Sequence, residues 1–166
     1  MNIWFIVGFI LLIFILAILV KALEAWLDKF RRPEYEYEKR MCIMTESERK
    51  CFIVLLQAVG DKYYVFPQIH LPTFLNHKIV GQNWNGAFRH IDEKSVDFVL
   101  CDKEKLCPIL AIELDDRTHE LPNRQERDRE VERILKFANM PLLRLEHKDI
   151  SDIENLTRKI MASMPI

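Results

Sequence analysis

The chain opens with an unbroken run of apolar side chains from Ile3 to Val20. As a helix with a rise of about 1.5 Å per residue, this run would be roughly 27 Å long, close to the roughly 30 Å of a membrane's hydrocarbon core. A cleaved signal peptide normally carries positive charge before such a run, whereas only Met1 and Asn2 precede this one and a lysine follows it. We therefore predict a transmembrane anchor over residues 1–20, with a buried core helix as the alternative.

The segment that follows alternates charged and aromatic residues. Its positive charges lie only on this side of the apolar run, at Lys21, Lys29, Arg31, Arg32, Lys39 and Arg40. By the positive-inside rule, the C-terminal side of the anchor faces the cytoplasm. Aromatic residues such as Trp26 suit an interfacial helix, and Pro33 is typical of a linker. Residues 21–43 are therefore expected to form a juxtamembrane helix and a linker.

The remaining residues, 44–166, alternate between helical and strand periods. Thr45 and Glu48 have the spacing of a capping box, and apolar residues follow at helical intervals until Gly60, which predicts a first helix. Aromatic and β-branched residues over Lys62–Leu71 predict a strand, in which Pro67 implies an edge or a bulge. The asparagine and glycine residues of Pro72–Ile91 predict a long loop.

Two strand-like runs, Ser95–Cys101 and Pro108–Asp115, are joined by a short polar turn and predict an antiparallel hairpin. A helical stripe follows over Arg124–Asn139, then a short buried strand over Pro141–Glu146 and a closing helix over Asp149–Ser163. The predicted order is α-β-β-β-α-β-α, which makes residues 44–166 one α/β domain.

Composition separates the anchor from the domain. The whole chain is 49% hydrophobic and 30% charged, but the first twenty residues are almost entirely apolar, which excludes an ordinary soluble protein. The remainder is about 43% hydrophobic, as in globular domains, which excludes a disordered tail or a fibrous chain. The net charge of −1 neither supports nor excludes binding to nucleic acid, because the local patch matters more than the sum.

The four cysteines show no CxxC or CxxH spacing of a zinc site, and a cytosolic domain is kept reduced. We therefore expect buried free thiols at Cys42, Cys51, Cys101 and Cys107.

Three acidic residues lie in the predicted hairpin. Alternate side chains of a strand share a face, so Glu113 and Asp115 project together while Leu114 packs on the opposite side. A turn centred near Lys105 would place Asp97 opposite Glu113, with β-carbons about 4.5–5.5 Å apart. Two carboxylates would then be adjacent, with a third nearby.

Like charges opposed in a sheet are destabilising, and a divalent cation would resolve the conflict. Mg²⁺ prefers oxygen ligands and is usually held by one or two carboxylates with water and substrate phosphate. We predict Mg²⁺ (or Mn²⁺) bound by Asp97, Glu113 and Asp115, which suggests phosphodiester chemistry. The alternative is that Asp97 caps the end of a strand, and that Glu113 and Asp115 pair with Arg124, Arg127 or Lys94 in a buried ion network.

The helix after the hairpin carries Arg124, Arg127 and Asp128 where its apolar stripe would continue towards the sheet, with Gln125 beside them. These residues would orient the carboxylates or grip a phosphate, or else form an exposed charged turn. His119 would donate to a phosphate, act as acid or base, or cap the loop before the helix.

Together these residues resemble a known family. Four motifs carry the resemblance: Val96-Asp97-Phe98-Val99-Leu100, Ile112-Glu113-Leu114-Asp115-Asp116-Arg117-Thr118-His119, Gln125-Glu126-Arg127-Asp128 and Leu142-Leu143-Arg144. They are similar to the bacterial family called domain of unknown function 2726, in the very-short-patch-repair-endonuclease-like branch of the PD-(D/E)xK nuclease superfamily. The similarity runs from about Met44 to Glu146.

The resemblance implies a restriction-endonuclease-like αβββαβ core with a mixed central sheet. It also implies a Mg²⁺-dependent nuclease in which Asp97 and Glu113 match the two acidic motifs and Glu48 is the acid of the first helix. The superfamily's usual lysine is replaced here by Asp115. The role of the missing lysine would then pass to Lys94, Gln125, Arg127 or His119, or Asp115 would bind a second metal ion.

The leading hypothesis is a single-pass protein of the bacterial inner membrane whose cytoplasmic domain is a metal-dependent nuclease with DNA as its expected substrate. One alternative is a catalytically impaired module that only binds nucleic acid. A second is a membrane scaffold with no nucleic-acid partner.

Overall fold

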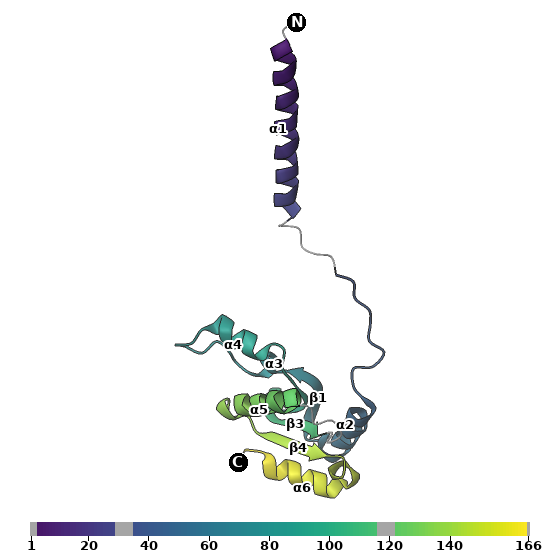
Figure 1. The fold of residues 1–166 in the computed structure, drawn as a ribbon. Coiled ribbons are helices and arrows are strands. Elements are labelled where there is room, and N and C mark those ends of the chain that lie inside the picture. The colour runs from purple at the N-terminus through teal and green to yellow at the C-terminus, as the bar shows by residue number, and fades with distance from the viewer. Residues whose placement is uncertain (1–2, 29–34, 116–121, 166) are drawn as a thin grey trace. The chain divides into compact units, whose positions relative to one another are not determined.

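The computed structural model describes residues 3–28, 35–115 and 122–165, and of residues 122–125 it describes the backbone alone (Figure 1). The chain divides into two compact units, Met1–Arg40 and Met41–Ile166. The first holds the apolar helix, and the second holds the α/β domain.

The first unit contains one long helix, α1, over Ile3–Asp28. Within this unit, none of its described side chains is buried. It is long and apolar enough to cross a membrane. Residues 21–28, expected as a separate juxtamembrane helix, instead continue α1. The helix continues through these residues because no glycine or proline interrupts it and their helix propensities are favourable, as at Lys21, Ala22, Leu23 and Glu24.

The domain is built on a mixed four-stranded sheet in the order β1-β2-β3-β4. Its strands are β1 over Tyr63–His70, β2 over Ser95–Asp102, β3 over Pro108–Asp115 and β4 over Leu142–Glu146. The first three pair antiparallel, and β4 joins β3 in parallel after the helix α5, Pro122–Phe137. All four predicted strands are confirmed.

The helices that flank the sheet also follow the predicted positions. α2 spans Glu46–Val59, and Thr45 and Glu48 form the expected capping box at its start. After β4, a short 3-10 turn over Asp149–Ser151 leads into α6, Ile153–Ser163. The predicted closing helix is therefore divided into two pieces. The division occurs because Asp152 has an extended backbone and caps α6 by accepting from the backbone N–H of Asn155.

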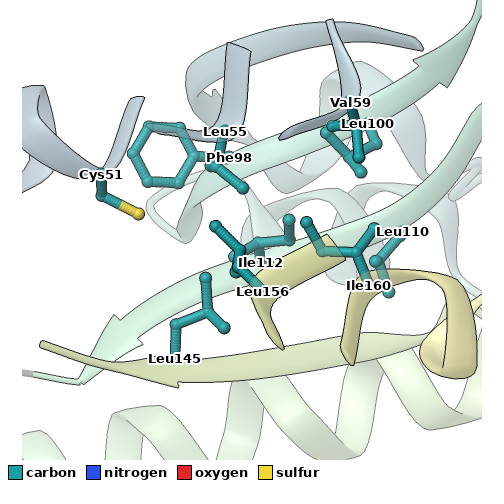
Figure 2. Close-up of a cluster of buried hydrophobic side chains, with 10 residues drawn as sticks. All are labelled: Cys51, Leu55, Val59, Phe98, Leu100, Leu110, Ile112, Leu145, Leu156 and Ile160. Carbon is teal, nitrogen blue, oxygen red and sulfur yellow. The ribbon is translucent and has the colours of Figure 1, made fainter. Parts of the chain in front are cut away.

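One face of the sheet packs on α2 and α6. Figure 2 shows the fully buried cluster between them, to which both helices and β2, β3 and β4 contribute: Cys51, Leu55, Val59, Phe98, Leu100, Leu110, Ile112, Leu145, Leu156 and Ile160. A second buried cluster, which includes Val131 and Leu135 of α5, lies on the other face. Both clusters lie wholly within Met41–Ile166, so this unit has its own core and is expected to fold in isolation.

The prediction of a long loop over Pro72–Ile91 is wrong. Two short helices lie there, α3 over Leu71–Phe74 and α4 over Trp84–Ile91. Asn83 and Gly86 suggest a turn in the sequence, but the Asn83 side chain accepts from the Gly86 backbone N–H at 3.1 Å and caps α4. The tertiary fold stabilises this short helix by burying Ile91 in the second core cluster.

Candidate functional site

The site is centred on the point where β2 and β3 separate, beyond the pair Phe98–Ile112, which we call the fork. Their ladder pairs Phe98 with Ile112, which is the register predicted for the hairpin, and one step further along lie Asp97 and Glu113. The Leu114 backbone N–H donates to Oδ2 of Asp97 at 2.8 Å, whereas in a regular ladder it would bond a carbonyl of the neighbouring strand. The Asp97 carboxylate therefore lies between the two strands.

A gap in the pairing of β1 with β2 faces this fork. Gln68 lies between the pairs Pro67–Phe98 and Ile69–Val96 and has a φ of 52°, a left-handed conformation that costs roughly 1–2 kcal/mol for a side-chain-bearing residue. Its side-chain amide donates to Oε1 of Glu48 at 3.1 Å. β1 is an edge strand, one of the two features that Pro67 suggested, and its register with β2 is the same on both sides of Gln68.

Glu48 is held from two sides. Its Oε2 accepts the Thr45 backbone N–H at 2.6 Å within the capping box, while Oε1 takes the Gln68 amide. Burial raises the pKa of Asp97 and of the Cys51 thiol, and the charge of Glu48 adds to both rises. One carboxylate thus both caps α2 and borders the site.

The other side of the fork contains an arginine that was not among the predicted site residues. Parallel pairing places Arg144 of β4 next to Glu113. Its Nη1 lies 3.2 Å from Oε2 of Glu113 and 2.8 Å from Oδ1 of Asp115. Its Nη2 approaches the backbone carbonyl of Asp128 in α5 at 3.5 Å. The sequence feature that could have identified Arg144 as a site residue is its position as the one charged residue within the apolar stretch Leu142–Leu145.

Negative charge exceeds positive charge at this site. Burial raises the pKa of Glu113 to about 7; Arg144 opposes this rise, and the charges of Asp97, Asp128 and Asp115 add to it. Burial also raises the pKa of Asp97. The hydrogen bond from the Leu114 N–H lowers this pKa, and the charges of the neighbouring acids add to the rise. Two largely buried carboxylates are therefore costly to ionise together, which is typical of functional sites.

The other predicted site residues either lie away from the fork or are outside the part of the chain that the structure describes. His119 and the Gln125 side chain lie outside the described residues. Arg127 is exposed on α5, and Lys94 donates from Nζ to the backbone carbonyl of His90. Both line a surface pocket with Glu93, Glu126 and Glu130. In the described part of the chain, neither contacts Glu113 or Asp97.

The cysteine prediction is half right. All four are free; Cys51 and Cys101 are buried, whereas Cys42 and Cys107 are exposed. Burial, with the charges of Asp97 and Glu48, raises the pKa of the Cys51 thiol to about 12, so it stays protonated beside the site.

The described residues contain no cluster of three metal ligands, but they do contain a pair of neighbouring carboxylates. Within residues 3–28, 35–115 and 122–165, no three His, Cys, Asp or Glu side chains are grouped closely enough to hold an ion. Mg²⁺, however, usually takes one or two protein carboxylates. Asp97 and Glu113 supply such a pair, and no described residue bonds Oδ1 of Asp97. This pair fits a divalent cation, while Asp115, bound by Arg144, stays only a predicted ligand.

Glu113 is expected to make stability depend on pH. Because its folded pKa of about 7 lies above its ordinary value of 4.5, its contribution to stability is complete below pH 4.5 and is lost as pH rises through 7. The loss by pH 8 is about 3 kcal/mol. Glu113→Gln should therefore lose less free energy of unfolding than wild type between pH 5 and pH 8, as measured by urea unfolding of residues 41–166.

Glu104→Gln, at an exposed position in the hairpin turn, is the matched control and should follow wild type. Equal pH dependence in Glu113→Gln and wild type would show that Glu113 is not the group that titrates.

Comparison with known proteins identifies a family. The model of the family described as "Protein of unknown function (DUF2726)" matches residues 40–164. No curated protein and no solved structure matches the chain. The match confirms the family that the motifs around Asp97 and Glu113 suggested.

Proposed function

We propose, from the premise that the chain belongs to the DUF2726 family, that it is a membrane-anchored, metal-dependent nuclease with DNA as its expected substrate. The single observation that supports this most is the pair of largely buried carboxylates, Asp97 and Glu113, at the separation of β2 and β3. The order α2-β1-β2-β3-α5-β4 around a mixed sheet agrees with a restriction-endonuclease-like αβββαβ core.

In this proposal, Asp97 and Glu113 hold Mg²⁺ or Mn²⁺. Such an ion, when bound, activates water as a nucleophile and stabilises charge on the phosphate. The chain's own residues position the two ligands: the Leu114 N–H fixes one oxygen of Asp97, and Arg144 fixes one oxygen of Glu113.

Arg144 is our candidate for the positive charge that the superfamily's lysine normally provides. Asp115 occupies the lysine's position, and the guanidinium of Arg144 reaches it from the neighbouring strand at 2.8 Å. An arginine stays protonated, so it cannot act as a base; its role would be to offset negative charge and to orient Glu113. Glu48, held by Gln68, would border the opposite side of the site.

A second candidate is a nucleic-acid-binding module without catalysis. It is favoured by the same arginine, because Nη1 of Arg144 engages both Glu113 and Asp115 and so already supplies some of the charge that a metal would bring. Such a module would bind through cations alone, with an affinity that falls steeply with salt and does not depend on metal.

The apolar helix α1 supports a proposal for where this activity would take place. α1 is long and apolar enough to span a membrane, and the positive charges after it, from Lys21 to Arg40, favour a cytoplasmic domain. We therefore propose a single-pass protein of the bacterial inner membrane with the nuclease-like domain on the cytoplasmic side.

The test is a cleavage assay with residues 41–166 on single- and double-stranded DNA and RNA, with Mg²⁺, Mn²⁺ or a chelator. We expect cleavage only with metal. Mn²⁺ should also stabilise the domain, by about 2.7 kcal/mol at a hundred times its dissociation constant. Salt-sensitive binding without cleavage would favour the second candidate. Absence of cleavage, metal stabilisation and binding would overturn both.

A further inference from the structure

The loop before α4 and the helix itself expose a group of apolar side chains. Ile79, Val80, Trp84 and Phe88 are 58%, 93%, 50% and 41% exposed; we call them the α4 patch. Trp84 and Phe88 lie one helical turn apart, so they share a face of α4. In Figure 1 the teal loop before α4 extends away from the sheet. Within the described residues of the domain, no core cluster includes these four side chains.

Internal contacts hold the patch in place. The Trp84 indole N–H donates to the Ile79 carbonyl at 2.8 Å, and the Gln82 amide donates to the His77 carbonyl at 2.7 Å. The His77 and Phe88 rings lie 5.1 Å apart. Because its only donor is used inside the loop, Trp84 presents an apolar ring. The exposed side chains are therefore presented by an ordered loop.

The segment that carries the patch is cationic. From Tyr63 to Ile91 the chain contains no Asp or Glu, although the whole protein has 25 acidic residues. Lys78 and Arg89 are exposed next to the patch. A surface with apolar side chains at its tip and cations beside them is complementary to an apolar phase bordered by negative charge.

We propose that the α4 patch docks the domain onto the surface of an anionic lipid bilayer, as a second membrane contact beside α1. The composition of the α4 patch favours binding to lipid over binding to a nucleic-acid strand, because Ile79 and Val80 have no π-face on which a base could stack. Aliphatic side chains can enter the acyl boundary, and tryptophan is favoured at the headgroup level.

The rest of the chain makes such a contact reachable. Seventeen residues, 29–45, separate the end of α1 from the start of α2, so the two are at most roughly 60 Å apart. A domain tethered over this distance meets the bilayer at a high effective concentration, and a weak contact is then sufficient. The inference does not rest on nuclease activity.

Trp84 is the only tryptophan of residues 41–166, so it reports on this surface directly. We expect vesicles of phosphatidylcholine with phosphatidylglycerol to shift its fluorescence to the blue and to sediment the domain. Pure phosphatidylcholine should do so at least about tenfold more weakly, and added salt should weaken binding. Brominated acyl chains should quench the same fluorescence.

Val80→Asp is expected to lower the affinity for anionic vesicles at least about tenfold, because a charge would have to enter the interface. Position 80 is 93% exposed, so the fold should tolerate the change. Phe137→Asp, at an 82% exposed site on α5, is the matched control and should bind like wild type. Equal binding of Val80→Asp and wild type would overturn the proposal. A Trp84 response to single-stranded oligonucleotides but not to vesicles would overturn it too, and would assign the patch to nucleic acid.

Discussion

Replacement of Asp97 by asparagine is expected to abolish metal-dependent cleavage and to leave the domain as stable as wild type or more stable. Asparagine keeps an oxygen that accepts the Leu114 N–H but removes a charge whose ionisation burial makes unfavourable. A metal would lose one of its two carboxylates. We expect cleavage to fall more than about 100-fold, beyond the usual effect of losing a group that only supports a metal ligand.

Initial cleavage rates and urea unfolding at pH 8 would measure both effects. Asp61→Asn, at an exposed position before β1, removes the same charge away from the site and should leave the rate unchanged. A drop in both rate and stability of Asp97→Asn would indicate a structural role. A wild-type rate would refute Asp97 as a ligand.

Loss of the Arg144 guanidinium should destabilise the domain in a pH-dependent manner. Arg144→Met leaves Glu113 and Asp115 without the cation that lies 3.2 Å and 2.8 Å from them. Breaking a buried pair costs about 3–5 kcal/mol. Because the Arg144 side chain is 29% exposed, we expect the lower end, about 3 kcal/mol, at pH 8. The loss should be smaller at pH 5, where Glu113, with its pKa of about 7, is protonated.

Arg144→Lys separates charge from geometry. A lysine keeps the positive charge but cannot span both Glu113 and the carbonyl of Asp128 with a planar fork. We expect it to recover most of the stability and little of the cleavage rate. Urea unfolding at pH 5 and pH 8 and cleavage assays with Mn²⁺ would measure both.

Arg158→Met, at an exposed position on α6, is the control for removal of an arginine. If Arg144→Lys cleaves like wild type, Arg144 contributes charge alone. A loss of stability in Arg144→Met that is the same at pH 5 and pH 8 would contradict a role in compensating Glu113.

Local pattern determined much of this fold in advance. The strand periods of β2 and β3 and the short turn between them were enough to predict the pairing of Phe98 with Ile112. The capping box of Thr45 and Glu48 located the start of α2. These features depend on residues close in sequence, whose side-chain periodicity and capping chemistry are set by the chain itself. The placement of Asp97 next to Glu113 followed from them.

Only the tertiary structure added the partners of these acids. Arg144 reaches Glu113 because β4 returns parallel to β3 after a helix of sixteen residues, and a parallel register across such a crossover depends on how the helix packs on the sheet. The left-handed backbone of Gln68 and the helix α4, which ends in the buried Ile91, likewise depend on distant contacts. The sequence by itself thus determined the elements and the carboxylates of one hairpin, whereas long-range packing decided which cation pairs with Glu113 and Asp115 and which apolar side chains stay exposed.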